Sequence, residues 1–157
     1  MRKIDFLLDK YAQSHQNHKN KIIHWVCIPV ILFTITGLMA MIPFPGSEKH
    51  WILNWSGLVI IFVSIYYASV SFSIMLGFLP VFIFFLFLHA FLRTYFESMG
   101  ISYIVILVAA FVIAWIGQFV GHHIEGKRPS FFDDLQFLLI GPAWLLHFIY
   151  KAIGLPY

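Results

Sequence analysis

Residues 101–129 read ISYIVILVAAFVIAWIGQFVGHHIEGKRP, and this stretch decides the fold. Its apolar part, 101–121, has about the 20 residues that a helix needs to cross the hydrocarbon core of a bilayer. It ends in Gly-His-His-Ile-Glu-Gly-Lys-Arg-Pro, where two histidines, a glutamate and two basic residues come close together. We therefore expect a transmembrane helix whose end carries potential metal ligands.

The composition of the whole chain agrees with a membrane protein. Of its 157 residues 61% are hydrophobic and only 11% are charged. A soluble domain of this size could not hide so much apolar surface from water. We expect one all-α integral membrane helical bundle over residues 1–157. The formal net charge of +3 is small and divided between the two ends, so it does not indicate nucleic-acid binding.

Three further apolar runs have the length of membrane spans. With the first stretch they predict four transmembrane helices, over residues 22–42, 51–70, 73–92 and 101–121.

Two more helices are expected outside the spans. Over residues 3–14, apolar side chains recur at helical spacing with charges opposite, which predicts an amphipathic helix lying on the membrane surface and carrying His15 on its apolar side. Over residues 130–153, Gly141-Pro142 interrupts an apolar run. This pattern predicts a broken helix that is interfacial or re-entrant.

The basic residues set the expected orientation. Eight of the ten lysines and arginines precede the first span or follow the fourth, and only Lys49 and Arg93 fall on the other side. The positive-inside rule therefore predicts that both termini are cytoplasmic. The membrane would be the inner membrane of a bacterium or the endoplasmic reticulum of a eukaryote.

The eight histidines are clustered along the chain. His15, His18 and His24 precede or begin the first span, and imidazole is costly to bury in lipid unless it is paired or bound to a metal. In one unbroken helix His15 and His24 would point in opposite directions. A break at residues 17–20, with Asn20 capping the first span, would let them share a site. The alternative is a polar hinge whose histidines face water.

The second cluster ends the fourth span. His122 and Glu125 share one helix face, whereas His123 points about 100° away. Such a pair suits a divalent metal, or a histidine oriented by a carboxylate. The alternative is a rim of salt bridges with Lys127 and Arg128. Both clusters are expected on the cytoplasmic side, which favours one metal site built from the two ends of the chain.

The residue types narrow the expected metal. No cysteine pair with ligand spacing occurs, which argues against structural zinc and iron–sulfur clusters. Only Glu125 is well placed among the carboxylates, whereas a carboxylate-bridged di-iron bundle needs about four. A histidine-dominated site, with or without Glu125, fits Fe2+ with open positions for dioxygen. His89 and His147 are expected to have a structural role or to contact this site.

The two clusters resemble the Mpo1-like family of small multi-span membrane proteins. The first motif is matched by Tyr11, His15, Asn20, His24 and Pro29, and the second by Gln118, Gly121, His122, Glu125, Arg128 and Pro129. The chain departs from the family pattern at His18, where many relatives have proline, and at His147, where many have glutamate. The pattern therefore does not assign these two histidines as ligands.

The resemblance implies an Fe(II)-dependent dioxygenase that shortens 2-hydroxy fatty acids by one carbon. It implies His15, His24 and His122 as iron ligands, with His123 and Glu125 as candidates for a fourth ligand or an orienting group. Further roles follow from the same resemblance: Tyr11, Asn20 and Gln118 would orient ligands or oxygen, and Arg128 would offset the substrate carboxylate.

Two other functions stay open at this point. A lipid hydroxylase or desaturase would use histidine boxes, which His15-x-x-His18 and His122-His123 resemble superficially. A non-enzymatic lipid-binding or scaffold bundle would use the histidines only as polar groups at the membrane interface.

Overall fold

The computed structural model describes residues 2–46, 50–126 and 137–157. Within these ranges the chain forms helices and no strand, which confirms the expected all-α fold. The helices are α1 (Lys3–Ala12), α2 (His18–Met41), α3 (Trp55–Val70), α4 (Phe72–Ser98), α5 (Tyr103–Glu125) and α7 (Ile140–Ile153).

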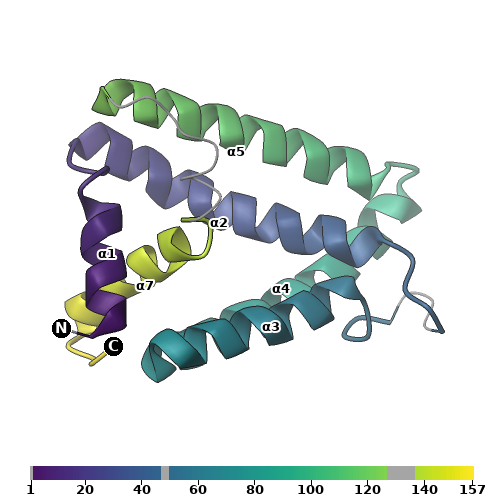
Figure 1. The fold of residues 1–157 in the computed structure, drawn as a ribbon. Helices are drawn as coiled ribbons and strands as arrows, with labels where there is room; N and C mark the ends of the chain where they lie inside the picture. Colours follow the sequence, from purple (N-terminus) through teal and green to yellow (C-terminus); the bar gives the residue numbers. More distant parts are fainter. Residues whose placement is uncertain (1, 47–49, 127–136) are drawn as a thin grey trace.

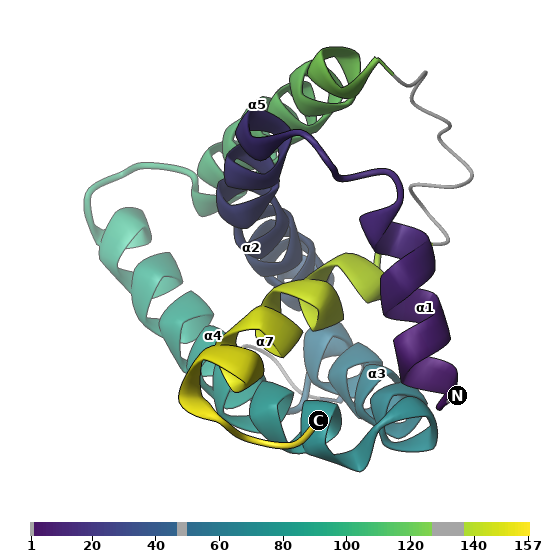
Figure 2. The same ribbon diagram turned by 90° about the vertical axis from the view of Figure 1, so that its left-hand side faces the viewer.

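Helix α2 lies at the centre of the arrangement. It packs most extensively against α5 on one side, and it also contacts α3, α4 and α7 (Figure 1). Helices α3 and α4 pair with each other on the opposite side of α2 from α5 (Figure 2). Helix α1 packs against α7, and the two chain termini lie near each other at that end (Figure 1). The first and last helices therefore meet.

Three of the described helices, α2, α4 and α5, are long and apolar enough to cross a membrane. Helix α3 has 16 residues and a length of about 24 Å, which is shorter than the hydrocarbon core. The outward surface is apolar: the side chains of Phe62, Val105 and Ile113 are 63%, 64% and 69% exposed. Such a surface is stable in lipid, where these groups need no cover from water.

The amphipathic helix α1 buries its apolar stripe in protein. Ile4, Leu8 and Tyr11 are buried, and they belong to the same core cluster as Trp144 of α7. The stripe therefore faces α7 and not lipid. Helix α7 begins at Ile140, and Gly141-Pro142 lies in its first turn, where proline costs no intrahelical hydrogen bond. The remainder of the expected C-terminal helix, residues 130–136, lies outside the described part of the chain.

The break between α1 and α2 differs from the one expected. Helix α2 begins at His18, and its N-cap is Asn17, whose side chain accepts a hydrogen bond from the backbone N–H of Lys19 at 2.9 Å. The expectation that Asn20 caps the helix is wrong. Asn20 lies inside α2 and is fully buried. Its side chain donates a hydrogen bond to Glu125 of α5 and does not cap its own helix. His15 consequently lies between the two helices, beyond the end of α1.

Two glycines of α5 allow its close approach to α2. A Cβ atom at Gly117 would lie 2.6 Å from Sγ of Cys27, and one at Gly121 would lie 2.4 Å from Oδ1 of Asn20. Both distances are far shorter than van der Waals contact. Gly117 and Gly121 are one turn apart, in the Gly-x-x-x-Gly spacing that lets membrane helices pack backbone to backbone.

We predict that Gly117→Leu weakens the packing of α2 on α5. The larger side chain collides with Cys27, and overpacking of this kind costs about 1–3 kcal/mol. The midpoint of thermal unfolding in detergent micelles should fall. Val120→Leu is the matched control, because Val120 of the same helix is 49% exposed and faces outward. Equal midpoints for the two variants would show that the close contact does not matter.

Candidate metal centre

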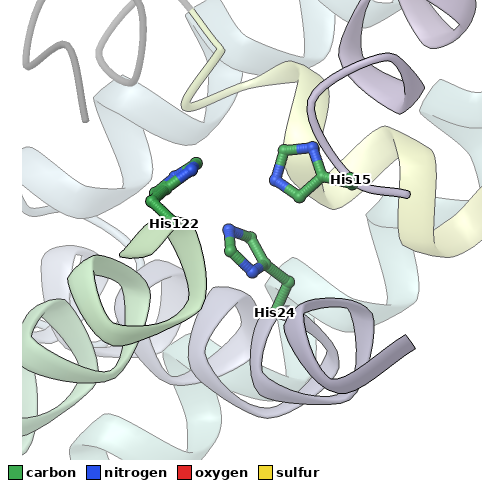
Figure 3. A group of neighbouring side chains, drawn as sticks. All are labelled: His15, His24 and His122. Atoms are coloured by element: carbon green, nitrogen blue, oxygen red, sulfur yellow. The ribbon is translucent and has the colours of Figure 1, made fainter. Parts of the chain in front are cut away.

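Three histidines from three parts of the chain meet in the interior. His15 lies after α1, His24 in the second turn of α2, and His122 in the last turn of α5. Their rings point toward one another (Figure 3). The ring centroids are 4.3 Å apart for His15 and His24, 5.0 Å for His24 and His122, and 5.5 Å for His15 and His122. One nitrogen from each ring lies within 4.8 Å of the others, so the three could hold one metal ion.

Backbone carbonyls set the tautomer of two of these rings. Nδ1 of His15 lies 2.8 Å from the carbonyl oxygen of Tyr11, and Nδ1 of His24 lies 3.0 Å from that of Asn20. A carbonyl oxygen only accepts hydrogen bonds, so Nδ1 carries the proton in both rings. In the neutral imidazole Nε2 then keeps its lone pair, the form that binds a metal. The local helical geometry thus leaves Nε2 of both rings in the form that can bind a metal.

The site is closed off from water. The three histidines are only 2%, 1% and 7% exposed. The ring of Tyr11 stacks on that of His15 with centroids 4.1 Å apart, and Trp144 of α7 lies 5.6 Å from His15. Trp144 was not among the expected site residues. Its place in an apolar run after Gly141-Pro142 gives no sign of this contact, which only the packing of α7 on α1 creates.

Glu125 fastens the segment that carries His15. Its carboxylate accepts hydrogen bonds from the backbone N–H of Gln16 at 2.7 Å and from that of Asn17 at 3.0 Å, and from Nδ2 of Asn20 at 2.8 Å. Glu125 does not belong to the group of candidate ligands. Its hydrogen bonds tie the α1–α2 connection, which carries His15, to the end of α5, which carries His122.

The other site candidates are not members of the triad. His123 is exposed and outside the candidate ligand group. Adjacent residues of a helix point about 100° apart, so His123 does not face the triad together with His122. His18 is exposed at the first position of α2. Gln118 and Tyr11 line a cavity beside His122. Arg128 and its neighbour Lys127 lie outside the described residues.

His89 belongs to a separate polar contact between helices. Its Nε2 lies 3.1 Å from Oγ1 of Thr36 on α2, and its Nδ1 lies 2.8 Å from the hydroxyl of Tyr103 on α5. Gly37 makes room for this ring, because a Cβ there would lie 2.6 Å from Cε1 of His89. Thr36 is three turns along α2 from His24, so His89 holds the bundle together far from the triad.

His147 is buried on α7, away from the triad. Its ring lies 4.5 Å from the ring of Tyr157 in an edge-to-face arrangement. Burial, followed by the nearby charge of Lys151, lowers the pKa of His147, so the neutral imidazole is favoured. His147 therefore packs the C-terminal end of the chain against α7.

Comparison with known proteins gives one consistent result. Residues 1–153 match the family described as 2-hydroxy-palmitic acid dioxygenase Mpo1-like. The chain is also 26% identical over 152 residues to 2-hydroxy-palmitic acid dioxygenase MPO1 of Saccharomyces cerevisiae, an alignment that covers 93% of this chain and 79% of the yeast protein. No solved structure matches the chain.

We predict that Glu125→Ala loosens the connection between α1 and α2. Two backbone N–H groups and the amide of Asn20 lose their acceptor, at a cost of about 1–3 kcal/mol. Hydrogen–deuterium exchange should become faster in peptides that cover residues 13–17. Glu97→Ala is the control, because Glu97 forms an exposed ion pair with Arg93 and such pairs contribute little. Unchanged exchange in Glu125→Ala would contradict the positioning role.

Proposed function

The chain belongs to the Mpo1-like family, and from this membership and the buried histidine triad we propose that it is an Fe(II)-dependent dioxygenase that shortens 2-hydroxy fatty acids by one carbon. The observation that carries the proposal is the convergence of His15, His24 and His122. Three buried imidazoles within reach of one ion are costly to assemble unless they bind a ligand.

The donor set fits ferrous iron. His15 and His24 present the Nε2 lone pair, and a set of three neutral nitrogen ligands would leave other positions of the ion for exogenous groups. When bound, the iron would supply activation of dioxygen, which does not otherwise react readily with an organic acid. The closed apolar surroundings would keep water from this reaction.

The remaining residues of the motifs would support this chemistry by position. Tyr11 stacks on His15 and limits the orientation of its ring. The backbone carbonyl of Asn20 accepts a hydrogen bond from His24, and its side-chain amide donates one to Glu125, so one residue connects two elements of the site. Gln118 lies one turn before His122 in α5 and lines the adjacent cavity, where it would contact the substrate. Arg128 would offset the charge of the substrate carboxylate.

The proposed reaction needs no external reductant. One 2-hydroxy acid and one dioxygen give the acid with one carbon fewer, one carbon dioxide and one water. The bond between carbons 1 and 2 breaks, and carbon 2 becomes the new carboxyl carbon. The substrate supplies all four electrons that reduce dioxygen.

Membrane insertion is part of the proposal. We infer one integral membrane domain with both termini on the cytoplasmic side, as the distribution of lysine and arginine indicates. The triad lies near the start of α2 and the end of α5, so it would be at the cytoplasmic membrane surface. A fatty acid could then present its polar head to the triad while its tail stays in the bilayer.

The reaction itself gives the first test. Protein loaded with Fe2+ and incubated with 2-hydroxypalmitate under oxygen should form the straight-chain acid one carbon shorter, with equal amounts of carbon dioxide. Mass spectrometry of the fatty acids identifies the product. A hydroxylated or unsaturated product of unchanged length would overturn the proposal in favour of a hydroxylase or desaturase.

Metal binding gives a second test. His24→Ala should lose bound iron and activity, whereas His123→Ala, which changes an exposed neighbour of the triad, should keep both. Elemental analysis of purified protein measures the iron. If wild-type protein is folded and active without metal, or if His24→Ala keeps the wild-type stoichiometry, the proposed iron site is wrong.

A further inference from the structure

A narrow slot opens beside the triad and runs between α2, α5 and the beginning of α7. Its volume is about 50 Å³, enough for a few water-sized groups in a row. Most of the side chains that line it are apolar, among them Ile28, Ile31, Leu32 and Trp115; Gln118 and His122 line it as well.

The slot continues the two helix faces that carry the triad. On α2, Ile28 and Ile31 lie four and seven residues beyond His24 and so share its face. On α5, Gln118 and Trp115 lie four and seven residues before His122, and α5 runs in the opposite direction. The slot therefore begins at the triad and extends about 10 Å toward the middle of the bundle.

The polarity of the walls changes along this length. Close to the triad the slot is lined by Gln118 and His122, which can form hydrogen bonds. Farther along it is lined by aliphatic side chains and by the indole of Trp115. Trp115 and Leu32 are half-buried, so the far end reaches the lipid-facing surface. This gradient, from polar to apolar to lipid, matches the gradient along a fatty acid.

We propose that this slot holds the first few methylene groups of the substrate, next to carbon 2, and that the rest of the acyl chain passes Trp115 into the bilayer. The assignment rests on the proposed function, because it takes the polar head of the substrate to lie at the triad. The slot is about 10 Å long, whereas one leaflet of the hydrocarbon core is about 15 Å thick. A long acyl chain that spans the leaflet would therefore extend beyond the slot, and its end would lie in lipid.

The slot predicts a particular specificity. A narrow passage bounded by α2, α5 and the beginning of α7 admits a linear chain and excludes a methyl branch near carbon 2. The part of the acyl chain beyond Trp115 lies in lipid, so its length does not change its contacts with the protein. The protein should therefore discriminate against branching near the head and tolerate a wide range of chain lengths. Trp115 is the specificity-determining residue of this passage.

Two variants and one control test the slot through kinetics. Leu32→Trp fills the passage and should raise KM for 2-hydroxypalmitate, lowering kcat/KM about tenfold or more. Trp115→Ala widens the passage, so a branched acid such as 2-hydroxy-4-methylpalmitate should gain about tenfold in kcat/KM relative to the unbranched acid. Ile116→Trp places the same large ring on the exposed face of α5 and should change neither value. Bound iron, measured in each variant, verifies that the triad is intact.

A photoaffinity probe tests the slot without turnover. A 2-hydroxy fatty acid with a diazirine at carbon 5 should label peptides that contain Ile31 or Trp115, and labelling should be lost in Leu32→Trp but not in Ile116→Trp. Labelling of these peptides in a protein that makes no shortened acid would leave the slot standing and overturn the proposed reaction. Turnover with labelling elsewhere, and normal kinetics of Leu32→Trp, would overturn the slot alone.

Discussion

The close contact between α2 and α5 is the constraint on which the site depends. Gly117 and Gly121 remove the side chains that would otherwise separate the two backbones. At Gly121 the space is taken by Oδ1 of Asn20 and by the ring of His24, whose Cε1 would lie 3.1 Å from a Cβ. A larger residue at this position would push His24 away from His122. The helix packing and the geometry of the histidine triad therefore both depend on the missing side chain of Gly121.

A second constraint is the polar network beside the triad. Asn20 and Glu125 are paired to each other, and Glu125 also binds the backbone of the segment after His15. Asn20 is fully buried, so its side-chain amide would be costly to leave without this acceptor. The network thus couples the α1–α2 connection, α2 and α5 into one unit. The site is assembled only when all three elements are in place.

Much of this arrangement could be predicted from the sequence, and the reasons differ for each part. Apolar runs of membrane length predict the helices, because the bilayer admits few other structures. The two histidine clusters meet because the start of α2 and the end of α5 lie at the same side of the bundle. The break at Asn17 could not be distinguished from one at Asn20, since both residues are good helix caps. The contact of Trp144 and the hydrogen bonds of Glu125 depend on tertiary packing, which no local pattern encodes.

The charge of the site gives a reason for its proposed preference for acids. Three neutral imidazoles would bring no negative charge into contact with Fe2+, and the carboxylate of Glu125, which accepts hydrogen bonds from Gln16, Asn17 and Asn20, is not among the candidate ligands. In a closed apolar site an uncompensated charge is unfavourable. A 2-hydroxy carboxylate would bring both a negative charge and a second oxygen ligand, whereas a neutral lipid would bring no charge. Under the proposed function, a carboxylate ligand to the iron would therefore come from the substrate, while Glu125 positions the α1–α2 connection.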